Sequence, residues 1–280
     1  MEECFFDAIL DTLKLLPYLF VTFLILEAIE HKLSKKSQKV IGKYKKIGPL
    51  IGGVMGGFPQ CGFSVMGANL YTCRVITMGT LVAIFLSTSD EMLPIMLGEG
   101  SMELGTILSI VGSKILIGVV VGVVVDLIFR RKVREDEAIK EVCEDEHCHC
   151  DKEGVWLASL KHTLKTAAFV LAANILINLL VFWIGTEQIA TFLENKNIFV
   201  YFVASLVGLV PNCAASVILT ELLMANVISV GVAMAGLLTG SGLGILILFK
   251  TNKSKKENFI ILGIIYLVGV LAGIITDLIL

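Results

Sequence analysis

Charged side chains are scarce in this chain of 280 residues, at 17%, whereas 56% of the residues are hydrophobic. Water-soluble domains carry about 25% charged and about 45–50% apolar residues, so the composition excludes a soluble globular protein. The sequence also lacks a GxxxxGK[ST] phosphate loop and an HExxH metalloprotease motif. It has seven cysteines, but Cys61, Cys73 and Cys213 lie in apolar segments, unlike a secreted disulfide framework. We expect an all-α polytopic membrane protein that is not an enzyme and has no cofactor.

Six apolar runs are long enough to cross a bilayer as helices, because about 20 residues span its hydrocarbon core. Two further apolar stretches, residues 48–73 and 199–225, are interrupted near their middle by Pro59 and Pro211. Each arm has only about half of the required length. We predict that both stretches are re-entrant helical hairpins, which gives ten helical segments in all. The six runs cover residues 8–30, 75–97, 104–129, 158–183, 226–249 and 258–280.

Basic clusters predict the orientation, because cytoplasmic loops are enriched in lysine and arginine. Residues 31–46, 130–134 and 250–256 are basic, whereas the connector 98–103 is acidic. A hairpin at 48–73 that enters and leaves from the cytoplasm puts all three basic clusters inside. We therefore expect both termini to be external, with the chain embedded in the lipid bilayer of a bacterial inner membrane.

An internal repeat appears when the chain is shifted by 151 or 152 positions. Residues 59–89 align without gaps with residues 211–241, and 11 of these 31 positions are identical. Three spans and one hairpin per half would place the second half upside down relative to the first, an architecture typical of secondary transporters. The predicted organisation is a first transmembrane repeat at 1–130, a cytoplasmic acidic linker rich in cysteine and histidine at 131–155, and a second, inverted repeat at 156–280.

Polar and sulfur-bearing side chains accompany both predicted hairpin tips. The tip prolines lack an amide hydrogen, so nearby backbone groups lose partners in a medium without water. Such backbone is tolerated where it lines a cavity, although tight packing between small residues is the alternative interpretation. We expect the tips to bind substrate through Gln60, Cys61 and Ser64 in the first half and Asn212, Cys213 and Ser216 in the second.

The span after the first tip contains the polar run at residues 87–91, followed by Pro94. Proline cannot donate to the carbonyl four residues earlier, which frees that of Asp90. The equivalent stretch, residues 239–242, is loosened by glycine and has no acid. Intramembrane carboxylates usually mark an ion or proton path, although Asp90 could instead face external water at the end of the span. We add Ser89, Asp90, Glu91 and Ser241 to the substrate site.

Lys114 lies near the middle of the run at 104–129. An unpaired charge there costs about 2.5–3.5 kcal/mol on insertion scales. Asp90, Glu91 and Glu221 are the candidate partners, and with Lys114 they form the predicted coupling group. A fixed positive charge would repel a divalent cation, so Lys114 is either a countercharge exchanged during transport or a sign of neutral or anionic cargo.

Two further clusters have the side chains of metal sites. One lies near the cytoplasmic end of the first span, where Glu27, Glu30 and His31 share a helical face and could receive a cation, or pair with neighbouring lysines. The other is in the linker, where adjacent thiols and imidazoles favour zinc or another soft divalent metal. A flexible acidic linker without metal is the alternative. The linker residues are Cys143, His147, Cys148, His149 and Cys150.

The motifs GGFPQCGFSV and FLSTSDEMLP, then GLVPNCAASV and LLTGSG, resemble those of a family of ten-transmembrane heavy-metal exporters. Members are also called manganese transporters or arsenic efflux proteins, and the family is similar to the arsenical permeases. The resemblance extends over essentially the whole chain. It implies efflux of a metal or metalloid, with the ten segments matching six spans and four hairpin arms. Members often have a histidine-rich central loop, whereas this one is short and mixes cysteine with histidine.

We therefore expect a proton-coupled secondary exporter that binds its cargo at the midplane between the tips. Manganese or zinc would use Asp90 and freed carbonyls, whereas an arsenical would use Cys61 and Cys213. The alternatives are an uptake transporter or channel for a small solute, or a membrane-embedded metal sensor that uses residues 143–150. The expected partners are the transported ion, the bilayer and, as a further candidate, a second copy in a homodimer; no nucleic acid is expected.

Overall fold

The structure is a computed structural model, and it describes residues 47–58, 62–72, 75–89, 92–98, 104–129, 197–211 and 213–279, with scattered positions at 16–24 and 156–175. All regular structure in these ranges is helical. The first half contains α3 (Gly48–Gly56), α4 (Gly62–Thr72), α5 (Met78–Ser87), α6 (Met92–Gly98) and α7 (Leu104–Ile128). The second contains α11 (Phe199–Gly208), α12 (Cys213–Met224), α13 (Val230–Thr239), α14 (Gly244–Thr251) and α15 (Lys255–Ile279).

Four of the described helical stretches have the length and hydropathy to cross a membrane. Two are the unbroken helices α7 and α15. The others, Met78–Leu97 and Val230–Thr251, each combine two helices, α5 with α6 and α13 with α14. The chain is thus a helical, multi-pass membrane protein. The predicted spans at 8–30 and 158–183 lie almost entirely outside the described residues.

Helices α5 and α13 form the centre of the described fold. Every residue of α5 is buried, as is every residue of α13 after Val230, whereas α7 and α15 expose large apolar side chains such as Leu108, Leu116 and Leu267. α5 packs against α3 and α7, and α13 packs against α11 and α15. Because apolar side chains can face lipid without cost, α7 and α15 suit the outer layer.

Glycines allow the outer helices to approach the central ones closely. Gly118 and Gly122 of α7 face the backbone of Ala83 and Gly79 in α5, and a methyl group on Gly122 would lie 2.5 Å from the Gly79 oxygen. In the second half, α15 uses glycine in the same way against α13, with Gly269 and Gly273 facing the backbone of Ala235 and Gly231. Small residues at the contact are typical of membrane helices, where close backbone packing supplies the attraction.

An aspartate of each outer helix caps the start of the neighbouring central helix, and the two caps have the same hydrogen-bond pattern. Asp126 of α7 accepts from the Thr77 hydroxyl at 2.7 Å and from the Gly79 amide at 2.8 Å. Asp277 of α15 accepts from the Ser229 hydroxyl and from the Gly231 amide at 2.8 Å. Thr77 and Ser229 are the N-caps of α5 and α13. The carboxylates satisfy amide donors that a helix start leaves unpaired.

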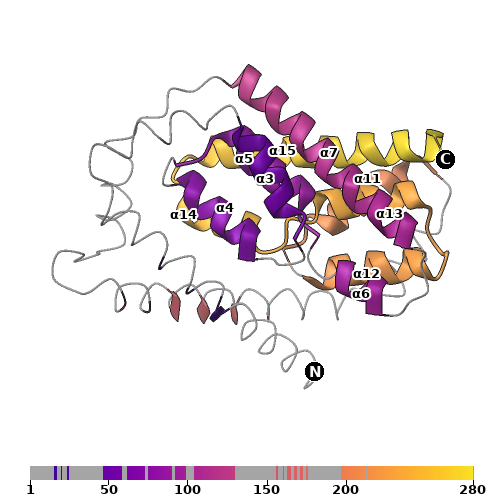
Figure 1. Cartoon of the computed structure of the whole chain (residues 1–280), viewed down its shortest axis with the longest axis horizontal. Coiled ribbons are helices and arrows are strands. Elements are labelled where there is room, and N and C mark those ends of the chain that lie inside the picture. The colour runs from indigo at the N-terminus through magenta and orange to yellow at the C-terminus, as the bar shows by residue number, and fades with distance from the viewer. Residues whose placement is uncertain are drawn as a thin grey trace.

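Two pairs of short helices join the halves. α4 packs mainly on α14, and α12 packs on α6, so each pair combines one helix from each half. Figure 1 shows the α4–α14 pair at one end of the fold and the α12–α6 pair at the other. α3 and α4, the two arms of the first predicted hairpin, therefore have different main neighbours: α3 contacts α5 and α7.

Candidate functional site

The candidate site lies where the two central helices end within the protein. α5 ends at Ser87 and α6 begins at Met92, while α13 ends at Thr239 and α14 begins at Gly244. Two predicted spans, 75–97 and 226–249, are thus each divided into two helices. Gly242 has a φ of 52°, a left-handed conformation in which glycine is unstrained. Pro94 lies in the first turn of α6, where a missing amide donor disturbs no bond, so the break precedes the proline.

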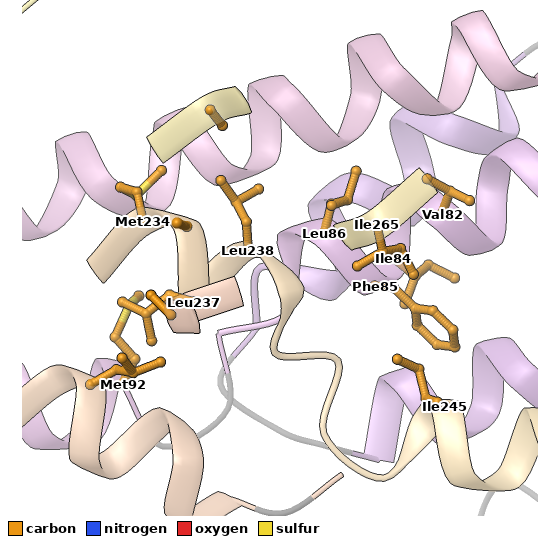
Figure 2. Close-up of a cluster of buried hydrophobic side chains, with 14 of the residues drawn as sticks. Val82, Ile84, Phe85, Leu86, Met92, Met234, Leu237, Leu238, Ile245 and Ile265 are labelled. Carbon is orange, nitrogen blue, oxygen red and sulfur yellow. The ribbon is translucent and has the colours of Figure 1, made fainter. Parts of the chain in front are cut away.

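Of the residues that the structure describes at the two breaks, those with hydroxyl side chains are buried. Thr88, Ser89 and Ser241 are each at most 2% exposed. A span that ended at external water would expose these residues, so the breaks lie inside the protein. Figure 2 shows the apolar side chains around them, with Met92 next to Leu237 and Ile245 close to Phe85. At the start of α14, a methyl group on Gly244 would lie 2.7 Å from the Phe85 ring, so α14 begins against the central helix of the other half.

Lys114 connects the two breaks. Its side chain is 1% exposed, and Nζ donates to the Thr88 carbonyl at 2.5 Å and to the Leu237 carbonyl at 2.8 Å. Thr88 is the C-cap of α5, and Leu237 lies in the last turn of α13. Helix C-termini carry a partial negative charge and unpaired carbonyls, so an ammonium there compensates both. At the equivalent position of the second half α15 has Ile265, which is also fully buried.

Hydroxyl groups make up the other polar side chains of this region. Thr239 donates to the Ser205 carbonyl at 2.9 Å, and Ser87 donates to the Ala83 carbonyl at 2.7 Å. In the described ranges, no three histidine, cysteine, aspartate or glutamate side chains come together as metal ligands. The described part of the site thus has hydroxyls, carbonyls and one ammonium.

Several predicted site residues belong to the described ranges. Ser64, Ser89, Ser241 and Lys114 are buried, and all four lie in or beside the helices that meet at the breaks. Ser216 is half-buried on α12, and Glu221 is exposed on the same helix. Lys114 donates to backbone carbonyls of both halves. Its pairing with Asp90, Glu91 or Glu221 stays a prediction.

The remaining predictions fall on residues whose side chains lie outside the described structure. Cys213 begins α12, but its side chain is not described. The others are the tip residues Gln60, Cys61 and Asn212, the acids Asp90 and Glu91, the first-span cluster Glu27, Glu30 and His31, and the linker residues Cys143, His147, Cys148, His149 and Cys150. Their roles stay predictions.

Sequence reasoning missed two polar contacts. The first is the helix cap that Asp126 and Asp277 each provide. The internal repeat could have revealed it, because it aligns these two acids at corresponding span ends. The other is a buried bond at 2.9 Å from the Tyr71 hydroxyl of α4 to the Glu257 carboxylate of α15. This bond joins the two halves near the C-terminal ends of α4 and α14. The two residues are 186 positions apart, so no local sequence pattern predicts their contact.

Comparison with known proteins gives a match to a protein family. Residues 2–183 match the model of a family described as "Putative, 10TM heavy-metal exporter". The match contains all of the described first half and ends before α11. No curated protein and no solved structure matches the chain.

Proposed function

The chain belongs to this family of heavy-metal exporters, and from that premise we propose that it is a secondary active transporter that exports a metal or metalloid across the membrane. The pair of buried helix breaks joined by Lys114 carries the proposal. Broken helices leave backbone carbonyls and amides unpaired at membrane depth, which is tolerated where protein or a cavity surrounds them. In secondary transporters such breaks hold the substrate and the coupling ion.

We propose that the two halves are inverted repeats. The capping bonds of Asp126 and Asp277, and the glycine contacts of α7 and α15, recur at an offset of 151 or 152 residues and support this arrangement. With the predicted hairpins at residues 48–73 and 199–225, the chain would have ten segments in an inner membrane and both termini outside. Transport would then proceed by movement of one half relative to the other around the breaks.

The proposed substrate site combines described and sequence-derived residues. Ser64, Ser89 and Ser241 lie at or next to the breaks, and Ser216 lies on α12. Gln60, Cys61, Asn212 and Cys213 would approach from the tips. Asp90 and Glu91 directly follow Ser89 in the sequence, and together with Lys114 and Glu221 they are the proposed coupling groups.

The first experiment measures flux into proteoliposomes that contain the purified protein. The panel comprises manganese, zinc, arsenite and a methylated arsenical, each with and without a pH gradient. We expect at least one of these solutes to cross faster than in protein-free liposomes and to respond to the gradient. Absence of flux for all four would contradict the proposed function.

Two variants then assign the ligands. The double variant Cys61→Ser/Cys213→Ser should abolish arsenical flux, because thiolates bind trivalent arsenic, but should spare a hard cation. With a hard cation such as manganese as the cargo, Asp90→Asn should instead abolish the flux and its response to the pH gradient. Ser109→Ala, on the exposed side of α7, is the matched control and should transport like the unmodified protein.

A further inference from the structure

Helices α4 and α14 lie side by side and point in the same direction. At their starts, a methyl group on Gly244 would lie 2.8 Å from the Ser64 Cβ. At their ends, the Thr72 and Thr251 hydroxyl oxygens are 3.0 Å apart. One helix comes from each half, so the pair brings two helix N-termini together next to the α13–α14 break.

Adjacent N-termini create a local positive potential. Each helix start carries about half a positive charge and up to four amides without an intrahelical partner. The first turns of α4 and α14 contain no acidic residue, and the N-cap of α14, Leu243, provides no side-chain hydrogen bond. Parallel dipoles repel at their like ends, so a negatively charged or electron-rich atom between these ends would stabilise the pair.

Ser241 supplies an independent sign of a ligand. It is 1% exposed, and among the described residues its hydroxyl has no hydrogen-bond partner. Its carbonyl accepts from the Gly244 amide at 3.2 Å, which fixes Ser241 against the first turn of α14. A buried hydroxyl without a partner is unfavourable, because the hydrogen bonds to water that it loses on burial are not replaced. An oxygen atom of a bound substrate would supply the missing partner.

We propose that Ser241 and the paired N-termini of α4 and α14 form a subsite for an oxygen atom of the cargo. The transported species is then a neutral hydroxide or an oxyanion of the metal or metalloid, and not a bare divalent cation. The Lys114 ammonium, bound to the carbonyl ends of the two central helices, adds positive charge near the same breaks. This inference rests on the proposed function and adds the chemical form of the substrate.

The test measures binding to the full-length purified protein by its thermal stabilisation, since a ligand that binds only the folded state raises the melting temperature. Arsenite is the neutral hydroxide probe, arsenate is the anionic probe, and manganese and zinc are the cationic probes. We expect arsenite or arsenate to stabilise the protein and manganese and zinc not to displace it. Ser241→Ala should weaken the binding of that probe at least tenfold.

The same variant has a second expected effect. Removal of an unpaired buried hydroxyl should leave the melting temperature of the ligand-free protein unchanged or raise it, so weaker binding is not explained by damage to the fold. If arsenite bound Ser241→Ala as tightly as the unmodified protein, thiols alone would account for its binding, and the proposal would be overturned. Ser109→Ala is again the matched control, because its hydroxyl is bonded to the Gly105 carbonyl on an exposed face.

The outcomes separate this inference from the proposed function. Stabilisation and flux with manganese or zinc, and not with the oxygen-bearing probes, would overturn the subsite and leave the transporter intact. Absence of binding and flux for every probe would overturn both. If Ser241→Ala does not fold, the competition between arsenite and manganese for the unmodified protein tests the subsite instead, and displacement of arsenite by manganese would overturn it.

Discussion

At the scale of single residues, the buried Lys114 links the two halves by hydrogen bonds to a helix end in each. Lys114→Met would leave the carbonyls of Thr88 and Leu237 without their donor. Hydrogen bonds to charged groups are worth about 1.5–3 kcal/mol in soluble proteins and about 0.6 kcal/mol on average between membrane helices. We expect the variant to lower the free energy of unfolding by about 1–3 kcal/mol, measured by thermal unfolding in detergent.

The matched control is Lys256→Met, a charge removal at an exposed position of α15. Exposed substitutions usually change stability by less than about 0.5 kcal/mol. If both variants melted at the same temperature as the unmodified protein, the helix ends would have to be stabilised by other donors. The role assigned to Lys114 would then be wrong.

The two carbonyls that accept hydrogen bonds from Lys114 could not be predicted from the sequence. Hydropathy and residue type identified Lys114 as an unusual charge within an apolar run, and the structure buries its side chain. Its described partners are main-chain carbonyls from two helices, the more distant 123 positions away. Every residue has such a carbonyl, so only tertiary packing selects them.

At the scale of helices, close backbone packing holds each central helix against its outer neighbour. Gly79→Ala would place a methyl group onto the Gly122 carbonyl, and Gly231→Ala onto the Gly273 carbonyl. Overpacking of this kind costs about 1–3 kcal/mol. We expect both variants to lose stability by similar amounts, because the two contacts recur in the two halves, and thermal unfolding would measure the loss.

Gly263→Ala provides the control, since a methyl group at this position of α15 would have no atom within 4 Å. Alanine in place of glycine in a helix should stabilise by up to about 1 kcal/mol. A large loss for Gly79→Ala with none for Gly231→Ala would contradict equivalent packing in the two halves.

The sequence was informative about helix ends and uninformative about helix neighbours. Glycine predicted a loosened stretch at residues 239–242, where α13 ends, because glycine weakens a helix locally. The runs 75–97 and 226–249 were each predicted as one span, and the structure divides each into two helices. The pairing of α4 with α14 and of α12 with α6 was not predicted. These contacts join segments about 120 and 180 positions apart, and their hydrophobic faces carry no information about the partner.

At the scale of the whole molecule, the proposed inversion makes equivalent positions face opposite sides of the membrane. Val75 lies in the turn before α5, and Val227, 152 positions later, lies in the turn before α13. The basic clusters predict that the first turn is cytoplasmic and the second external. In a variant without the seven native cysteines, Val227→Cys should react with a membrane-impermeant maleimide on intact cells.

Val75→Cys should react with the same reagent only after the cells are permeabilised, because its turn would lie on the cytoplasmic side. Lys253→Cys, in the exposed turn before α15, should behave like Val75→Cys and serves as an internal reference. Equal labelling of Val75→Cys and Val227→Cys from one side would require the two halves to have the same orientation. The capping bonds of Asp126 and Asp277 would then mark a parallel repeat, and transport by opposed halves would have to be abandoned.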